Sequence, residues 1–359
     1  MAEVTEIRLA LPGKGALEAA TSAFLAECGM KVNRKNPRQY LARISSMPEV
    51  EVVFQRAADI PALVQDGDAA FGITGYDILA EHRGYGYDEQ EGDHDGEDLI
   101  VLKRDLEYGH CRLVVAVPET WIDVSSMADL WHLAGYYQEH KRRALRIATK
   151  YPVLTGRFLR RHGITQCRLV SPHGALEAAP LTDTADLIVD LTETGTTLRE
   201  NHLKLLSDGV VLKSQACLIA NPHLLRENER ALRQAEIMIE LIEARMAARN
   251  RSLLTASLPG ESLETVQQQV RQINQRLQGL QTDVELRVSS YEADSQGLQG
   301  PGRYTLTGIV RVKGEEASRL LEIVAVLRSS GATDINVTPL TYRFSHEPPA
   351  LLKRGLHKM

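Results

Sequence analysis

One strand-type segment that ends in a carboxylate and runs into a threonine-rich turn constrains this chain more than any other feature. The run Asp186-Leu-Ile-Val-Asp190 precedes a turn with four threonines, one glutamate and Gly195, and a helical apolar pattern extends from Leu198 to Leu205. Such a turn presents backbone N–H groups and the positive end of the helix dipole. Gly195 permits the positive φ that folds those amides into a nest. The segment therefore predicts an α/β fold with an anion-binding turn.

The side chains of this turn indicate which anion it suits. Hydroxyl donors are available from Thr192, Thr194, Thr196 and Thr197. Asp190 and Glu193 add carboxylates near the carboxyl end of the strand, where α/β proteins place their ligands. The alternative is an ordinary corner in which a threonine caps the helix, but one threonine would serve that purpose. Four threonines around a glycine, with acids beside them, favour a phosphoribose site.

Composition indicates a soluble globular protein. The 359 residues, 43% hydrophobic and 25% charged, predict two or three domains. The net charge of −5 and the lack of a basic stripe with interleaved aromatic residues argue against a nucleic-acid partner. Charged residues near the N-terminus argue against a signal peptide, and no apolar run is long enough to span a membrane. We therefore expect a cytoplasmic protein with no membrane partner.

The cysteine pattern points the same way. The four cysteines stand far apart in the sequence, at Cys28, Cys111, Cys167 and Cys217. This spacing suggests neither a disulfide framework nor a CxxC metal site. Reduced thiols in a reducing compartment are the simpler expectation, with no metal site built from protein side chains.

Alternating strand and helix patterns organise the first 110 residues. Asp77 is predicted to cap the helix that follows the third strand of this region. Such βαβ repetition favours a mostly parallel sheet covered by helices. The predicted strands cover residues 7–11, 50–55 and 69–74, and the predicted helices cover residues 17–28 and begin again at Asp59.

A second α/β unit is predicted from Cys111 onward, and a third module follows a long helix. The second unit has predicted strands at 111–117, 146–148, 169–170 and 210–220, and helices at 153–162, 175–179 and 224–250. The third has predicted strands at 252–258, 284–291, 304–312 and 334–340, and helices at 260–277 and 315–328. Its β-α-β-β-α-β order is typical of a split ferredoxin-like module.

An acidic run at residues 87–98 interrupts the first unit. A cation site is conceivable there, but the run lacks the ligand spacing of an EF-hand. We interpret it as a solvated and dispensable loop.

These motifs, taken in order, resemble ATP phosphoribosyltransferase, the first enzyme of histidine biosynthesis. The resemblance extends from about residue 7 to residue 340, and its most specific part is Glu177 followed thirteen residues later by the Asp190–Leu198 turn. Several ordered matches are stronger than the TG-x-T core alone. The other matching pieces are residues 11–17, 28–29, 59–64, 72–75, 111–113, 146–152 and 213–218.

The resemblance implies a two-lobed catalytic core of the type II periplasmic-binding-protein kind. Two crossings would join the lobes, with the active site in the cleft between them. The expected bounds are 1–110 with 206–228 for the first lobe, 111–205 for the second and 250–345 for the C-terminal ferredoxin-like (ACT-like) domain. That domain identifies the long form of the family, which carries the histidine feedback site. The resemblance also implies a homo-oligomer, a dimer or a hexamer built from dimers.

The implied reaction joins N1 of ATP to C1 of the ribose of phosphoribosyl pyrophosphate and releases pyrophosphate. Mg²⁺ held largely by substrate oxygens is the expected cofactor. Asp190 and Glu193 would accept hydrogen bonds from the ribose hydroxyls, and the 5-phosphate would bind to Thr192, Thr194, Gly195, Thr196 and Thr197. Glu177 would be a second carboxylate in the cleft, although a surface salt bridge is an equal alternative.

Further candidates for substrate binding are basic or lie in loops. Lys14 and Gly15 follow the first strand, while Arg56 and Arg112 lie at strand ends, and for each an exposed solubility residue is the alternative. Lys150 follows a predicted strand, at a position that in the family is often occupied by a small polar or basic residue. The clearest departure is Ala16, where the family commonly has an arginine whose bidentate fork binds phosphate.

Histidine is expected to bind the C-terminal module at the turn formed by Ala332, Thr333 and Asp334 after Gly331. A plain helix C-cap at Gly331 is the alternative.

The competing functional class is a binding module or a catalytically silent regulatory subunit. The intact Asp190, Thr194, Gly195 and Thr197 argue against a silent subunit.

Overall fold

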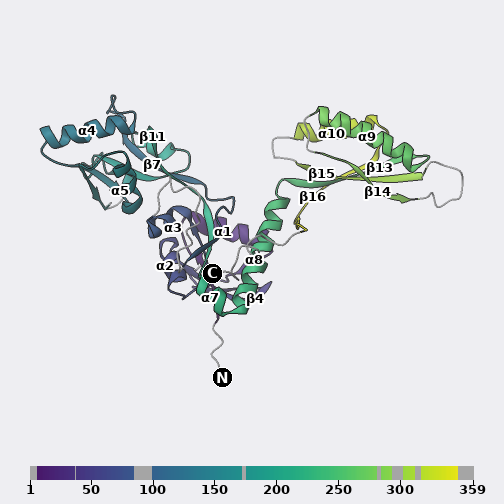
Figure 1. Ribbon diagram of the computed structural model, residues 1–359, viewed down its shortest axis with the longest axis horizontal. Helices are drawn as coiled ribbons and strands as arrows, with labels where there is room; N and C mark the ends of the chain where they lie inside the picture. Colours follow the sequence, from purple (N-terminus) through teal and green to yellow (C-terminus); the bar gives the residue numbers. More distant parts are fainter. Residues whose placement is uncertain are drawn as a thin grey trace, which may run out of the picture. The chain divides into compact units, whose positions relative to one another are not determined.

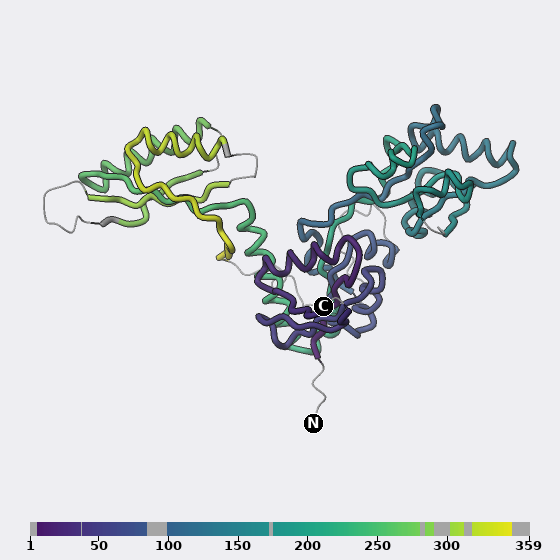
Figure 2. The backbone as a smooth tube through the Cα atoms, turned by 180° about the vertical axis from the view of Figure 1, so that it is seen from behind, coloured from purple at the N-terminus to yellow at the C-terminus, as the bar shows by residue number. Residues whose placement is uncertain are grey.

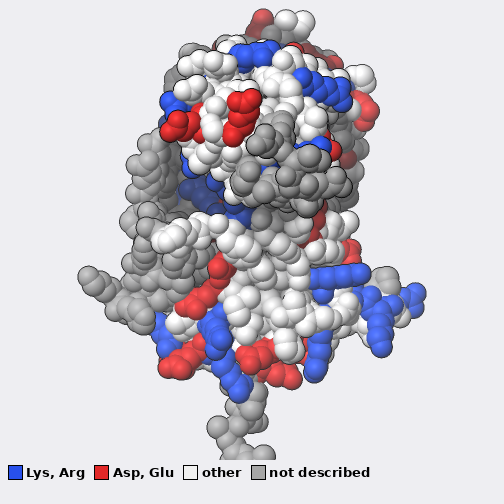
Figure 3. All heavy atoms as spheres, turned by 90° about the vertical axis from the view of Figure 1, so that its right-hand side faces the viewer, with Lys and Arg blue, Asp and Glu red and all other residues white. Residues whose placement is uncertain are grey.

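The computed structural model describes residues 6–36, 38–84, 99–171, 175–280, 284–292, 302–311 and 317–346. The predicted acidic loop at residues 87–98 lies outside this part of the chain. Two compact units are present: one contains the chain up to Ile239, and the other begins at Glu240. On the face drawn in Figure 3, basic and acidic side chains are interspersed. None of the described helices is long and apolar enough to cross a bilayer.

The first lobe of unit 1 is built on a seven-stranded sheet, with helices α1, α2 and α3 following its strands (Figure 1). β1 pairs in parallel with β4 and β5, as the βαβ pattern predicted. The strands, in sheet order, are β2 (Val32–Asn33), β3 (Leu41–Ile44), β4 (Met47–Gln55), β1 (Ile7–Pro12), β5 (Phe71–Gly75), β12 (Ala216–Ala220) and β6 (Ile100–Lys103). The helices are α1 (Ala16–Glu27), α2 (Ile60–Gln65) and α3 (Tyr76–Arg83), with the short η1 (Ala57–Asp59) before α2.

The predicted cap at Asp77 is wrong. Gly75 is the N-cap of α3, and Asp77 lies inside the first turn with its side chain buried. Its carboxylate accepts hydrogen bonds from Ser214 and Tyr151 instead of from the amides of its own helix. These long-range partners outcompete the local capping geometry, because they bond to both carboxylate oxygens.

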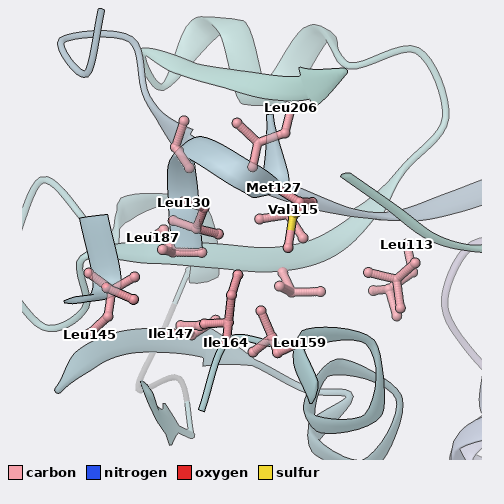
Figure 4. Packing of buried hydrophobic residues seen from close by; sticks show 14 of the residues in the cluster. Leu113, Val115, Met127, Leu130, Leu145, Ile147, Leu159, Ile164, Leu187 and Leu206 are labelled. Carbon is pink, nitrogen blue, oxygen red and sulfur yellow. The ribbon is translucent and has the colours of Figure 1, made fainter. Parts of the chain in front are cut away.

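The second lobe of unit 1 is a five-stranded sheet with β10 at its centre. Leu187, Val115 and Ile147 of this sheet belong to one buried cluster with residues of helices α4 and α5, and Figure 4 shows their side chains in that cluster. The strands, in sheet order, are β11 (Leu203–Ser214), β7 (Cys111–Pro118), β10 (Leu187–Thr192), β8 (Leu145–Thr149) and β9 (Cys167–Val170). The helices are α4 (Met127–His140), α5 (Pro152–Arg161), η2 (Leu176–Ala178) and α6 (Thr196–Glu200).

Helix α4 was not predicted, although the sequence carries its start signal. Ser126 accepts a hydrogen bond from the Asp129 amide, and the Asp129 carboxylate accepts one from the Ser126 amide. This reciprocal pair is a capping box in which aspartate takes the place of the usual glutamate.

Two crossings connect the lobes, as the two-lobed fold requires. The first leads from β6 to β7, and the second lies between β11 and β12, where Gln215 separates strands of different sheets. The predicted single strand at 210–220 is therefore two strands, and the return to the first lobe comes at Gln215 instead of residue 206. Strand-type residues before Lys213 and after Gln215 hid this break from the sequence pattern.

Two predicted helices also differ from the structure. The helical pattern from Leu198 to Leu205 ends early, because α6 stops at Glu200 and His202 adopts a positive φ of 55° before β11. The predicted helix 224–250 is two helices, α7 (Pro222–Glu227) and α8 (Glu229–Ala248). Asn228 separates them, and its side chain accepts hydrogen bonds from the first amides of α8.

Unit 2 confirms the predicted β-α-β-β-α-β order. Its sheet has the order β14-β15-β13-β16, and the two helices cover one face of it in both views (Figures 1 and 2). Leu254, Leu306 and Ile273 belong to the core between sheet and helices. The elements are β13 (Arg251–Gly260), α9 (Leu263–Gly279), β14 (Arg287–Glu292), β15 (Gly302–Arg311), α10 (Ala317–Ser329) and β16 (Thr333–Pro339).

A buried carboxylate just before β10 is expected to stabilise the fold in a pH-dependent way. Asp186 accepts hydrogen bonds from Arg143 at 2.6 and 2.8 Å and from the Arg146 amide at 2.7 Å. Burial alone would raise the pKa of Asp186, but the hydrogen bonds from Arg143 and Arg146 hold it well below its usual range. The carboxylate therefore stabilises the fold fully above the unfolded pKa of about 3.9, and less as the pH falls further.

Asp186→Asn is expected to lower the free energy of unfolding by about 1.5–3 kcal/mol at pH 7. Chemical denaturation at pH 7 and at pH 3 measures this difference. The difference in the free energy of unfolding between wild type and variant should be smaller at pH 3 than at pH 7. A difference of the same size at both pH values would contradict the stabilising role of the ionised Asp186. Asp123→Asn, at an exposed loop position, is the matched control.

Candidate active site

The threonine-rich turn forms a compact corner between β10 and α6. Gly195 has φ +79°, so the residue lies in the left-handed region that glycine favours. Its amide donates to the Thr192 hydroxyl at 2.8 Å, and Thr192 is buried. Leu198, also buried, anchors the following helix in the core. The Thr192 hydroxyl thus supports the turn from within.

The outer side of the turn is exposed and rich in hydroxyl groups. Glu193, Thr194, Thr196 and Thr197 are all exposed. The hydroxyls of Thr194 and Thr196 lie 2.9 Å apart, and Arg199 donates to the Thr196 hydroxyl at 3.2 Å. The first amides of a helix have no partner within the helix. The corner therefore offers hydroxyls, backbone amides and one guanidinium to an anion.

Asp190 lies on the sheet face next to η2. Side chains alternate along β10, so Val189 joins the cluster beneath α4 and α5, whereas Ile188 joins the cluster of Leu176 on the opposite face. Asp190 shares the face of Ile188, and η2 carries Glu177. The predicted pair of carboxylates is therefore brought together.

The surroundings of Asp190 shift its acidity. Burial raises the pKa of Asp190, the nearby Glu177 carboxylate raises it further, and the Leu191 amide and Lys150 oppose the shift. The Leu191 amide donates to Asp190 Oδ1 at 2.8 Å. Lys150 follows β8 directly and is exposed, so an ammonium group stands beside the carboxylates.

Basic side chains lie at the same edge of this sheet. In the strand register, Thr192 of β10 is opposite Arg112 of β7, and Arg112 is opposite Lys213 of β11. Arg112, which was predicted, is half-buried, whereas Lys213 is exposed. Lys213 was not singled out in the sequence, although it begins one of the matching pieces.

The candidates of the first lobe also lie together. Pro12 of β1 is opposite Gln55 of β4, and the Gly13 amide donates to the Gln55 carbonyl at 2.7 Å. Lys14 and Arg56 therefore leave neighbouring strands at one edge, and both are exposed. Gly15 begins α1 with φ +88° and ψ −173°, a conformation nearly confined to glycine.

Ala16, the departure from the family pattern, has a guanidinium nearby. Ala16 is the exposed first residue of α1. Arg34 pairs with Glu18 in the first turn of that helix at 2.8 Å and lies over the Phe54 ring at 3.9 Å. The Arg34 guanidinium thus lies beside the first turn of α1, where it is paired with Glu18.

The crossings place both sets of candidates on the facing sides of the two sheets. β11 ends at Ser214 and β12 begins at Ala216, while Arg112 directly follows the start of β7. In the first sheet, Ala216 is opposite Gly75 at the carboxyl end of β5. The carboxyl ends of β1, β4 and β5 therefore share this side with the carboxyl ends of β8 and β10.

Cys111 also lies at this edge, but as a neutral thiol. Burial and the neighbouring Asp77 carboxylate raise its pKa to about 11, and Glu193 adds to the shift. A thiol with that pKa is protonated at neutral pH, so it is a poor nucleophile.

The predicted histidine contacts lie at the end of α10. The amides of Gly331 and Ala332 donate to the carbonyls of Arg328 and Leu327, which is the geometry of a helix C-cap. Thr333 donates to the Asp334 carboxylate at 3.2 Å, and Arg303 lies 3.7 Å from the same group. Ala332 is buried, whereas Thr333 and Asp334 are exposed.

Comparison with known proteins identifies a family. A family profile described as ATP phosphoribosyltransferase matches residues 56–248, more than half of the chain. ATP phosphoribosyltransferase 2, chloroplastic, from Arabidopsis thaliana is 36% identical over 96% of this chain and 78% of the relative. ATP phosphoribosyltransferase from Bradyrhizobium diazoefficiens is 33% identical over 96% of both chains.

A shorter relative matches about two thirds of the chain. ATP phosphoribosyltransferase from Chelativorans is 41% identical over 66% of this chain and 98% of the relative. The two longer relatives cover nearly the whole chain. Relatives of both lengths therefore match this chain, and the chain belongs to the ATP phosphoribosyltransferase family.

Proposed function

We propose that this chain transfers the phosphoribosyl group of phosphoribosyl pyrophosphate to N1 of ATP and releases pyrophosphate, the first step of histidine biosynthesis. The observation that carries this proposal is the half-buried Asp190 beside the exposed threonine corner at Gly195. The Asp190 carboxylate suits the hydroxyls of a ribose, and the threonine corner suits the 5-phosphate of the same sugar. An absorbance assay for phosphoribosyl-ATP, formed from ATP and phosphoribosyl pyrophosphate with Mg²⁺, tests the proposed function.

The residues around the ribose suit a transition state with positive charge on the sugar ring. Asp190 and Glu177 would stabilise that charge, and Asp190 and Glu193 would accept hydrogen bonds from the ribose hydroxyls. Thr194, Thr196, Thr197 and the Gly195 amide would orient the 5-phosphate, with Thr192 holding the turn in shape. The reacting carbon is thereby held at the edge of the sheet.

The basic groups suit the polyphosphates. Lys14, Gly15 and Arg56 in the first lobe and Arg112 in the second lie at the facing edges, so they would bind pyrophosphate or the ATP triphosphate. Mg²⁺, when bound, would neutralise charge on the leaving pyrophosphate. Among the described residues no three acidic, histidine or cysteine side chains cluster as metal ligands. Magnesium usually keeps several waters and binds through substrate phosphates, so the metal ion would be carried mainly by substrate oxygens.

Asp190 and its neighbours give a prediction for the pH dependence. If Asp190 must be ionised, activity falls as the pH drops through its raised pKa. Glu177→Gln removes a neighbouring negative charge, which should move the acid limb of the kcat profile to lower pH. Lys150→Met removes a positive charge and should move it to higher pH. Shifts in the same direction for both variants would contradict the role of Asp190.

The regulatory part of the proposal rests on unit 2. We propose that free histidine inhibits the enzyme through this module and that the chain forms a homo-oligomer, a dimer or a hexamer. Support comes from the ferredoxin-like order of β13 to β16 and from the longer relatives, which each match 96% of this chain. The turn at Thr333 and Asp334 offers a hydroxyl and a carboxylate to an amino acid.

All four cysteines are free thiols, which suits a reducing compartment such as the cytoplasm.

Truncation after Asn250 is expected to abolish inhibition by histidine while a soluble catalytic core remains. A coupling of about 1–3 kcal/mol corresponds to roughly 5–150-fold weaker substrate binding in the full chain with histidine. Titration of histidine against activity in both forms measures it. A truncated enzyme that keeps the histidine sensitivity of the full chain would contradict the role of unit 2.

A further inference from the structure

A buried carboxylate of the first lobe is bonded to two side chains of the second. Asp77, in the first turn of α3, is 4% exposed. Its Oδ1 accepts from the Ser214 hydroxyl at 2.6 Å, and its Oδ2 accepts from the Tyr151 hydroxyl at 2.6 Å. The Asp77 amide also donates to the Ser214 hydroxyl at 2.8 Å. Hydrogen bonds to an ionised acceptor are the strong ones in proteins.

The two partners of Asp77 sit beside the candidate active site. Ser214 ends β11 at the second crossing, directly after Lys213. Tyr151 follows Lys150 in the loop between β8 and α5, and its amide donates to the Thr149 hydroxyl at 2.9 Å. Burial and the nearby Asp77 raise the pKa of Tyr151, and Asp190 is close enough to raise it further. The phenol is therefore neutral and available as a donor.

A second carboxylate of α3 strengthens the same link. Glu81, one helical turn after Asp77, accepts from the Val153 amide at 2.8 Å and from the Leu154 amide at 2.9 Å. Both amides lie in the first turn of α5, which Tyr151 precedes. One helix of the first lobe thus holds the start of a helix of the second.

We infer that Asp77, Tyr151 and Ser214 are positioning residues that fix the substrate-binding edge of the second lobe against the first. This inference rests on the proposed function, because Lys14 and Arg56 in one lobe would act on the substrate held at Asp190 in the other. The phosphoribose turn lies wholly within the second lobe, so its own affinity does not depend on the bridge. Loss of the bridge therefore affects the reaction more than the binding of phosphoribosyl pyrophosphate.

Tyr151→Phe is the sharpest test, because it removes one hydroxyl and keeps the ring. The expected result is a kcat at least about 10-fold lower, with a KM for phosphoribosyl pyrophosphate within about threefold of wild type. Asp77→Asn should lower kcat in the same way. The double variant should be little worse than Asp77→Asn alone, since Asp77→Asn already weakens the hydrogen bond that Tyr151→Phe removes. Tyr136→Phe, at a tyrosine 50% exposed on α4, is the matched control and should leave both constants unchanged.

Three results would overturn the inference: an unchanged kcat in Tyr151→Phe, a rise in KM without a fall in kcat, or additive losses in the double variant. Failure of the proposed function looks different. In that case wild type and Tyr136→Phe would both form no phosphoribosyl-ATP, and the inference would fall with the function. If wild type, Tyr136→Phe and Tyr151→Phe were all fully active, the proposed function would stand and only the positioning role of the Asp77 hydrogen bonds would be wrong.

Discussion

Replacing Gly195 with valine is expected to abolish the use of phosphoribosyl pyrophosphate in a chain that still folds. Gly195 has φ +79°, a conformation that a β-branched residue adopts only with strain. Space is not the obstacle, because an added Cβ would meet its nearest atoms at 3.7 and 3.9 Å. The turn would instead change its backbone conformation and disperse the amides and hydroxyls that orient the 5-phosphate.

Thr194→Ala tests the same turn without backbone strain. The loss of one hydroxyl donor to a charged partner corresponds to about 1.5–3 kcal/mol, or roughly a 10- to 100-fold fall in kcat/KM for phosphoribosyl pyrophosphate. Steady-state kinetics with varied phosphoribosyl pyrophosphate at saturating ATP measures both variants.

Each of these variants has a matched control in the chain. Thr120→Ala removes an exposed threonine of a loop that carries no candidate residue. Gly163→Val places the same strain at φ +72° after α5, far along the chain from the turn. Both controls should keep the kinetic constants of wild type. If Thr194→Ala also kept them, the assignment of this turn to the 5-phosphate would be wrong.

Asp190→Asn is expected to lower kcat by roughly 10- to 100-fold with little change in the KM for phosphoribosyl pyrophosphate. The amide keeps the shape of the side chain but carries no charge, and charge matters most when the ribose ring becomes positive. The fall should therefore appear in the transition state. Asp123→Asn, at an exposed position, should leave both constants unchanged.

A pure affinity defect in Asp190→Asn would lead to a different assignment. In that case Asp190 would position the bound substrate and would contribute nothing specific to the transition state. The pH profile provides an independent check, because the asparagine has no proton to lose. The acid limb assigned to Asp190 should be absent from the profile of this variant.

Much of the fold could be predicted from the sequence, because local periodicity reports local structure. The strands β1, β4 and β10 and the helices α1 and α5 all lie where the apolar pattern predicted them, within a few residues. The whole of unit 2 followed from the order of its elements. These elements are decided by nearest neighbours along the chain, so one sequence is enough to find them.

The second crossing could not be predicted in the same way. Strand-type residues lie on both sides of Gln215, at Val210–Leu212 and Ala216–Ala220, and only the pairing of β11 with β7 and of β12 with β5 shows that they belong to two sheets. Asn228 hid the break between α7 and α8 for a different reason, since asparagine is tolerated within helical patterns. Pairing between distant segments decides the boundary between β11 and β12, whereas the Asn228 side chain caps α8 locally.

The same distinction applies to the site. The threonine turn was visible because its parts are contiguous, and Glu177 entered through the family resemblance. The bridge of Asp77 to Ser214 and Tyr151 joins residues up to 137 positions apart, and no local pattern announces it. At Asp77 the local pattern favoured a helix cap, and tertiary hydrogen bonds took its place.

The central claim is that the Asp190 edge binds phosphoribosyl pyrophosphate for transfer to ATP. Its most direct test is the absorbance of phosphoribosyl-ATP formed by the purified full chain from ATP, phosphoribosyl pyrophosphate and Mg²⁺, with Thr194→Ala and Thr120→Ala alongside. We predict product with wild type and with Thr120→Ala, and a strongly reduced rate with Thr194→Ala. A folded wild-type chain that forms no product under these conditions would contradict the claim.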